Sequence, residues 1–210
     1  TDNAEEFRQK GELLTTFLHQ VPNDQDQVTL DNYYTNQPIT IALDKALTPS
    51  QNAQRYFKRY QKLKEAVKYL TELIEETKAT ILYLESVETV LNQAGLEEIA
   101  EIREELIQTG FIRRRQREKI QKRKKPEQYL ASDGKTIIYV GRNNLQNEEL
   151  TFKMARKEEL WFHAKDIPGS HVVISGNLAP SDEVKTDAAE LAAYFSKGRL
   201  SNLVQVDMIE

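Results

Sequence analysis

The chain has 210 residues, of which 30% are charged and 39% hydrophobic, and its formal net charge is −4. Because it contains no cysteine, disulfide scaffolds and thiolate metal sites are excluded. No apolar run approaches the roughly 20 residues that span a bilayer, so we expect no membrane span. No initiator methionine or secretory signal heads the chain, and its first residues already follow a helical pattern. We therefore expect a fragment of a longer protein.

Charge is distributed unevenly and divides the chain into three segments. Residues 1–112 carry 11 basic and 19 acidic side chains, residues 113–125 carry 9 and 1, and residues 126–210 carry 9 and 13. We interpret these segments as a helical coiled-coil region, a basic linker and a small α+β domain. The predicted fold class is therefore α+β, with a long helical coiled-coil arm before the small domain.

The first segment begins with a predicted helix over residues 2–20, whose apolar side chains recur at roughly helical spacing. Pro22 and Asn23 end this helix. The β-branched and aromatic residues that follow flank a turn-prone stretch at residues 35–38, which predicts a small β-hairpin at residues 28–42. We expect the hairpin to cap a longer helical element.

A heptad pattern is the clearest feature of the first segment. Nine of its eleven positions are apolar, and their 4,3,4,3 spacing is typical of a coiled-coil seam. A start signal at residues 48–50 and a stop signal at Gly95 predict one helix of about 44 residues, roughly 66 Å long at ~1.5 Å per residue. The seam positions are Tyr56, Tyr60, Leu63, Val67, Leu70, Ile74, Thr77, Ile81, Leu84, Glu88 and Leu91.

An apolar stripe on one helix needs a partner that covers it. Residues 2–20 are too few to cover a helix of this length. The remaining seam would pack against upstream sequence outside this chain, against a predicted short helix at residues 96–110, or against another molecule. Self-association through the seam therefore stays open.

The basic segment 113–125, "RRRQREKIQKRKK", has two interpretations. Runs of charge are commonly solvated linkers. Cations packed this densely in an otherwise acidic chain also form a local field suited to phosphate, and counterion release makes such binding strongly dependent on salt. The candidate phosphate-binding residues are Arg113, Arg114, Arg115, Arg117, Lys119, Lys122, Arg123, Lys124 and Lys125.

Residues 126–210 alternate between predicted strands and helices. Asp133–Gly134 supplies a strong hairpin-turn signal, and Ser181 is suited to cap a helix. We expect a mainly antiparallel sheet that is truncated on its C-terminal side. The predicted elements are a hairpin at residues 127–141, a short helix at 143–155, strands at 160–164 and 171–175, a helix between Ser181 and Gly198, and a strand at 203–209.

The stretch "WFHAKDIPGSHVVI", residues 161–174, concentrates the candidate functional side chains. If its two strands pair, Trp161 and His163 share one face, and His171 lies close to them across the strands. One interpretation is a structural motif with aromatic core anchors and a Pro–Gly turn. The other is a binding surface, in which the aromatic ring, the imidazoles and the free amides of the Gly169–Ser170 turn hold a base or a phosphate.

Metal binding and catalysis are less favoured for this stretch. Two imidazoles with Asp166 or Asp207 match no known zinc spacing. Ser170 and His171 are adjacent on a strand, so they point to opposite faces, and no nucleophile elbow surrounds them. An acid–base pair of His163 and Asp166 is the remaining enzymatic hypothesis. We expect no metal, no cofactor and no enzymatic activity.

The run "GRNNLQNEELTFKMARKEELWFHAKDIPGSHVVI", residues 141–174, resembles the signature of the RNA-binding domain of the NFACT family of ribosome quality-control factors. The preceding heptad helix and the residues that link it to the domain resemble the middle coiled-coil region of that family. Glu148 and Glu159 depart from the pattern, because many members carry aspartate there. The matching residues are Gly141, Arg142, Asn143, Asn144, Leu150, Thr151, Trp161, Phe162, His163, Ala164, Asp166, Pro168, Gly169, Ser170 and His171.

This resemblance implies a cytoplasmic factor that binds an obstructed large ribosomal subunit and recruits tRNA for template-free alanine tailing of the stalled chain. The present chain would be its RNA- and ribosome-contacting arm, without the N-terminal half that carries the main tRNA-recognition module. Besides the basic segment, the residues expected to contact RNA are Arg142, Asn143, Asn144, Trp161, His163, Asp166, Gly169, Ser170 and His171.

Adhesion to fibronectin at the cell surface is the alternative function, because some members of the family are named for it. The sequence contains no repeat suited to adding a strand to a partner's sheet and no wall anchor. Its chemistry therefore gives no specific signal for fibronectin, and the two functions are compatible with each other.

Overall fold

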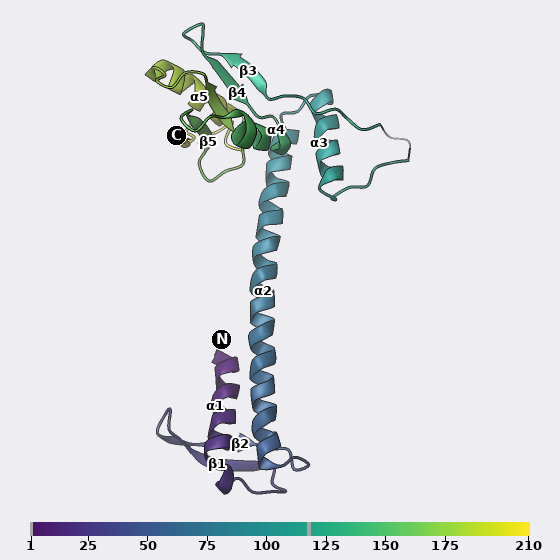
Figure 1. Ribbon diagram of the computed structural model, residues 1–210, viewed down its shortest axis with the longest axis vertical. Coiled ribbons are helices and arrows are strands. Elements are labelled where there is room, and N and C mark those ends of the chain that lie inside the picture. The colour runs from purple at the N-terminus through teal and green to yellow at the C-terminus, as the bar shows by residue number, and fades with distance from the viewer. Residues whose placement is uncertain (1, 117–118) are drawn as a thin grey trace. The chain divides into compact units, whose positions relative to one another are not determined.

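The computed structural model describes residues 2–116 and 119–210. It divides into two compact units, Thr1–Lys78 and Ala79–Glu210, and the boundary falls inside helix α2 (Pro49–Leu91) (Figure 1). Each unit has its own hydrophobic core. Among the described helices, none combines the length and the hydropathy that a bilayer span requires.

The first unit packs helix α1 (Asp2–Thr16) and a small hairpin against the start of α2. The antiparallel strands β1 (Gln27–Asn32) and β2 (Gln37–Ala42) pair where the sequence predicts a hairpin. A short 3-10 helix, η1 (Leu18–Gln20), connects α1 to this hairpin. The buried core consists of Leu13, Leu14, Val21, Val28, Leu30, Ile41 and Ala53.

Helix α2 contains 43 residues, close to the predicted length. At its N-terminal end Tyr56 contacts the ring of Phe7, and its hydroxyl donates to the carbonyl of Ala42. The middle of the heptad stripe is exposed, with Leu70 at 53% and Ile81 at 52%. The long helix is therefore present, whereas the coiled coil stays a prediction.

The second unit contains a five-stranded antiparallel sheet in the order β3-β4-β6-β5-β7. Helix α5 (Asp182–Tyr194) covers one face, where Phe162, Val172 and Ile174 are buried against its apolar side. The α+β class with antiparallel sheets is therefore confirmed. The strands are β3 (Glu127–Leu130), β4 (Ile137–Val140), β5 (Trp161–Ala164), β6 (Val172–Ser175) and β7 (Val206–Ile209).

Local signals explain where the helices of this unit begin. The Ser181 hydroxyl accepts from the Val184 amide at the start of α5, as the sequence predicts for a cap. Asn143 caps α4 (Asn144–Glu149) by accepting from the Gln146 amide at 2.8 Å. Helix α4 continues into the π-helix η2 (Leu150–Met154). Helix α3 is the remaining helix and spans Leu96–Gln108.

Candidate nucleic-acid interface

Three rings form an aromatic cluster on the sheet face opposite α5. Trp161 and His163 lie two residues apart on β5 and stack with their ring centroids 5.6 Å apart and their planes at 13°. His171, just before β6, meets both rings edge-on at 5.2 and 5.3 Å. The proximity of the two imidazoles that strand pairing predicts is therefore confirmed. Trp161 Nε1 is buried without a hydrogen-bond partner among the described residues, so stacking holds this ring.

Helix α4 and η2 hold His171 in place. The hydroxyl of Thr151 lies 2.7 Å from His171 Nδ1, and the His171 amide donates to Asn147 Oδ1 at 3.0 Å. Gly141 makes room for this arrangement, because a Cβ atom there would lie 2.1 Å from Asn147 Oδ1. The signature residues Gly141 and Thr151 therefore position the imidazole of His171.

Burial keeps both imidazoles neutral near pH 7. Loss of solvation lowers the pKa of His163 below its ordinary value. The same cause, aided by the neighbouring His163, lowers the pKa of His171 to about 4. The cluster therefore offers stacking and neutral hydrogen bonds, and it supplies no cation for phosphate.

The turn between β5 and β6 packs against the end of α5. The Ser170 amide donates to the carbonyl of Phe195 at 2.9 Å, and the Lys197 amide donates to the carbonyl of Pro168 at 2.8 Å. Gly169 allows this approach, because a Cβ atom there would lie 3.0 Å from Ser196 Cβ. The expectation that the Ser170 amide is free is wrong, since the end of α5 already accepts its hydrogen.

Two residues of this turn differ in exposure. Ser170 is buried, so its hydroxyl is turned away from solvent. Asp166 is exposed and adopts a positive φ of 56°, which orients the turn. Of the residues predicted from this turn, Asp166 is exposed and Gly169 is half-buried, and their contact with RNA stays a prediction.

The residues Arg142, Asn143 and Asn144 are engaged inside the second unit. Arg142 is 11% exposed, forms ion pairs with Glu127 at 3.1 Å and Glu98 at 3.3 Å, and lies over the Phe195 ring. Asn143 Nδ2 donates to Glu101, and Asn144 Nδ2 donates to Glu105. These side chains connect β4 and α4 to helix α3, and their predicted contact with RNA stays untested.

Glu159, a departure from the family pattern, has a structural position. One of its carboxylate oxygens accepts from the Gly176 amide at 2.8 Å and the other from the Arg156 amide at 2.9 Å. The side chain is buried, and it joins the residues before β5 to those after β6. The longer glutamate stem is therefore accommodated by two backbone donors.

The basic segment is partly paired with α3. Arg114 forms an ion pair with Glu104, Lys124 forms one with Glu97, and Arg123 donates to Gln108 Oε1 at 2.9 Å. Arg117 lies outside the described residues. The described cations of the segment that are exposed, including those that also contact α3, are Arg113, Arg115, Lys119, Lys122, Arg123, Lys124 and Lys125.

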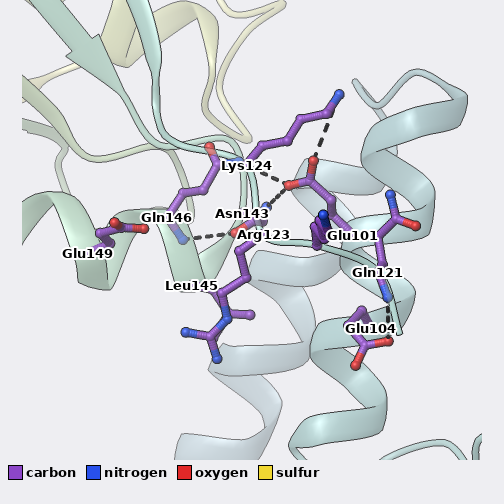
Figure 2. A pocket seen from close by; sticks show the side chains of 10 residues that line it. Glu101, Glu104, Gln121, Arg123, Lys124, Asn143, Leu145, Gln146 and Glu149 are labelled. Atoms are coloured by element: carbon purple, nitrogen blue, oxygen red, sulfur yellow. Dashed lines mark hydrogen bonds and ion pairs between the residues drawn. The ribbon is translucent and has the colours of Figure 1, made fainter. Parts of the chain in front are cut away.

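A pocket lies between α3, the basic segment and α4 (Figure 2). Glu101 projects into it from α3 and accepts from Asn143 and Gln146, at 3.2 and 3.1 Å. Glu104 accepts from the Gln121 amide on the same side. Sequence reasoning missed these glutamates, because acidic side chains on a short amphipathic helix are normally solvated.

Two further cations follow helix α5 and were also missed, and one of them, Lys197, contacts the Pro168–Ser170 turn. Lys197 is tied to Pro168 through its amide, and the Arg199 guanidinium lies 4.0 Å from the centroid of the Tyr194 ring. Both side chains are exposed. A local signal was present in the sequence, because "KGR", residues 197–199, lies at the end of the predicted last helix. Lys197 adds a positive charge beside the signature turn, and its ammonium group lies 3.9 Å from Glu85 Oε1.

The fold and this site define an α+β module that combines a sheet-borne aromatic cluster with exposed cations. A family model described as NFACT N-terminal and middle domains matches residues 1–125, and one described as NFACT protein RNA binding domain matches residues 125–209. The chain belongs to the NFACT family. This confirms the resemblance that the signature residues carry.

Similar proteins support the same assignment. The chain is 96% identical over 210 residues to the "Rqc2 homolog RqcH" of Streptococcus pneumoniae serotype 2 strain D39, covering 100% of this chain and 38% of that protein. It is 42% identical over 214 residues to the "Rqc2 homolog RqcH" of Bacillus subtilis strain 168, covering 99% of this chain and 37% of that protein. The chain thus spans less than two fifths of these relatives.

A solved structure is also similar to this chain. It is described as the C-terminal of the fibronectin/fibrinogen-binding protein from Streptococcus suis. The TM-score is 0.77 at 66% sequence identity, and the match covers 100% of this chain and 71% of that one. The fold is therefore shared with a protein whose description names fibronectin and fibrinogen.

Proposed function

We propose that this chain is the RNA- and large-ribosomal-subunit-contacting part of a cytoplasmic ribosome quality-control factor. The observation that carries the proposal is the match of residues 125–209 to an NFACT RNA-binding domain, on a module that presents exposed cations. Relatives named RqcH support the assignment to ribosome quality control. Recruitment of tRNA for alanine tailing is the finer proposal, and it concerns the whole protein.

The module acts by binding in this proposal, without catalysis. The exposed cations of the basic segment would contact phosphates. The neutral rings of His163 and His171, with Trp161, would contact an unstacked base or a ribose. Charge supplies affinity and the ring cluster supplies selectivity for accessible bases.

The exposed stripe of α2 would be the seam of a coiled-coil arm. Its apolar side chains include Val67, Leu70, Ile74 and Ile81, which are each about half exposed in this chain alone. A second helix is required to remove them from water. Sequence outside this chain and a second copy of the chain both remain candidates for this helix.

Fibronectin binding at the cell surface is the second candidate function. The observation that favours it is the description of the similar Streptococcus suis structure as fibronectin/fibrinogen-binding. Binding to fibronectin and binding to RNA can be measured on the same preparation. The effect of salt separates them, because an RNA complex depends on phosphate contacts.

The proposed function is tested by charge reversal in the basic segment. The variant Lys119→Glu/Lys122→Glu/Lys125→Glu replaces three exposed cations, and Lys58→Glu/Lys62→Glu/Lys64→Glu on α2 is the control with the same change of charge. Binding of labelled tRNA and of large ribosomal subunits is measured between low and physiological salt. We expect the first variant to lose roughly tenfold or more in affinity and to show a salt slope smaller by about 2–3.

Equal losses in the two variants would show that net charge alone drives binding, and the proposed role of the segment would be wrong. A fibronectin pull-down on the same variants tests the alternative. Capture of fibronectin that persists after the first charge reversal, without any binding of RNA, would favour the adhesion function.

A further inference from the structure

One face of helix α3 binds the basic segment of the same chain. Glu97, Glu101, Glu104 and Gln108 recur at intervals of four, three and four residues, so they lie on a single side of the helix. Lys124 pairs with Glu97, Arg114 with Glu104, and Arg123 with Gln108. The contacts therefore extend along nearly the whole of α3 and form a row that we term the α3 latch.

The pKa values of the charged residues in the α3 latch are shifted in the directions that ion pairing causes. The hydrogen bond from Lys124 lowers the pKa of Glu97, and the pKa of Lys124 is raised in return. Arg114 is the main cause that lowers the pKa of Glu104 to about 2. Both carboxylates are therefore charged at neutral pH and hold the cations in the manner of phosphate oxygens.

The α3 latch has a weak point at Glu101. This carboxylate is buried, and its Oε1 atom accepts no hydrogen bond from any described residue. Lys124 Nζ lies 4.0 Å from that atom (Figure 2). The same ammonium group also bonds Glu97. Lys124 is half exposed, and exposed ion pairs are individually weak. Exchange of partners by Lys124 is therefore accessible, whereas the pair of Arg114 with Glu104 is more buried and opens less readily.

We propose that α3 is an internal competitor of RNA: its carboxylates hold Arg114 and Lys124 in a closed state, and RNA phosphates must displace them to bind the basic segment. This proposal rests on the proposed RNA binding of that segment. The apparent affinity for RNA equals the intrinsic affinity multiplied by the fraction of molecules in which the α3 latch is open. Polyanions with closely spaced phosphates, such as folded RNA, open it, and isolated anions at low concentration do not.

The competition is tested in the 210-residue chain with Glu97→Gln/Glu104→Gln. Both changes keep the size of the side chain and remove one charge each. The matched control is Glu88→Gln/Glu190→Gln, which removes two exposed carboxylates from α2 and α5. We expect RNA affinity at low salt to rise roughly three- to tenfold in the latch variant and less than about twofold in the control.

A second readout follows the latch without RNA. Trypsin cleavage after Lys122, Arg123 or Lys124 reports release of the segment from α3. We expect the latch variant to be cut several-fold faster than wild type at low salt, and we expect the difference to shrink as salt opens the wild-type latch. Should the double variant fail to fold, Glu97→Gln alone, at an exposed position, is expected to raise RNA affinity roughly twofold to threefold.

The outcomes separate the two proposals. RNA binding of equal affinity in the latch variant and the control overturns the competition and leaves the proposed function standing. Absence of RNA binding by every form, including wild type at low salt, overturns the proposed function and the competition with it. Higher affinity together with faster cleavage in the latch variant supports both.

Discussion

Helices α3 and α5 of the second unit have the same length, 13 residues, and pack in opposite ways. Helix α5 buries Val184, Ala188 and Ala192 against the sheet. Helix α3 buries Glu101, Glu104 and Glu105, with Ile102 as its buried aliphatic residue. One helix is thus held by the hydrophobic effect, and the other by hydrogen bonds and ion pairs whose strength depends on charge.

The largest effect is expected where α5 and the sheet share their core. Phe162→Ala removes a buried ring between β5 and α5 and should lower the free energy of unfolding by about 3–5 kcal/mol. Urea denaturation at low and high salt measures it, and the loss should be nearly the same at both. Phe152→Ala, at an 81% exposed position on η2, is the control and should change stability by less than about 0.5 kcal/mol.

A smaller loss of stability is expected from replacing Glu105, one of the buried carboxylates of α3. Glu105 accepts from the Tyr83 hydroxyl at 2.7 Å and from Asn144 Nδ2 at 3.0 Å. Glu105→Ala leaves both donors without their acceptor and should cost about 2–3 kcal/mol, whereas Glu105→Gln, which keeps one oxygen, should cost less. Denaturation curves for both variants provide the measurement.

The matched control for this prediction lies on the solvent side of α5. Glu190→Ala removes the same group from an exposed position. Equal losses of unfolding free energy in Glu105→Ala and Glu190→Ala would show that the buried carboxylate of Glu105 does not stabilise the packing of α3. The two helices would then differ in composition but not in how they are held.

The contrast also explains how much the sequence could predict. The apolar spacing on α5, its Ser181 cap and the pairing of His163 with His171 follow from local periodicity, so they were predicted. The long helix α2 was predicted in the same way, and its role as the seam of a coiled coil stays a prediction. These features could be predicted because each of them depends on residues that are close together in the sequence.

The contacts of the buried glutamates on α3 could not be predicted from local patterns. Glu101 accepts hydrogen bonds from Asn143 and Gln146, which follow it by more than 40 residues. The spacing of residues in the sequence does not predict such a long-range contact. For the same reason the ion pairs of Arg142 with Glu98 and Glu127 were not predicted, and its contact with RNA stays a prediction. Partners of charged side chains are set by tertiary packing, which composition and spacing do not encode.

The smallest expected effect is a pH dependence of stability that involves His171 on the sheet and leaves the Glu104 pair on α3 unchanged. The pKa of His171 is lowered to about 4 in the folded chain, below the ordinary 6.5, so the unfolded chain binds the proton more readily. The stability that the neutral imidazole contributes is complete above pH 6.5 and is lost as pH falls toward 4. Over this window Glu104, with a pKa of about 2, stays charged and paired with Arg114.

Acidification should therefore weaken the ring-bearing face of the sheet before it affects the Glu104 pair on α3. We expect the free energy of unfolding to fall by on the order of 2 kcal/mol more in wild type than in His171→Gln between pH 7 and pH 4. Denaturation at intermediate pH values measures the difference. Parallel pH profiles for the two forms would show that the imidazole is solvated in the folded chain. The aromatic cluster would then be an open, protonatable surface, in place of the neutral, partly buried one that the contacts of Thr151 and Asn147 define.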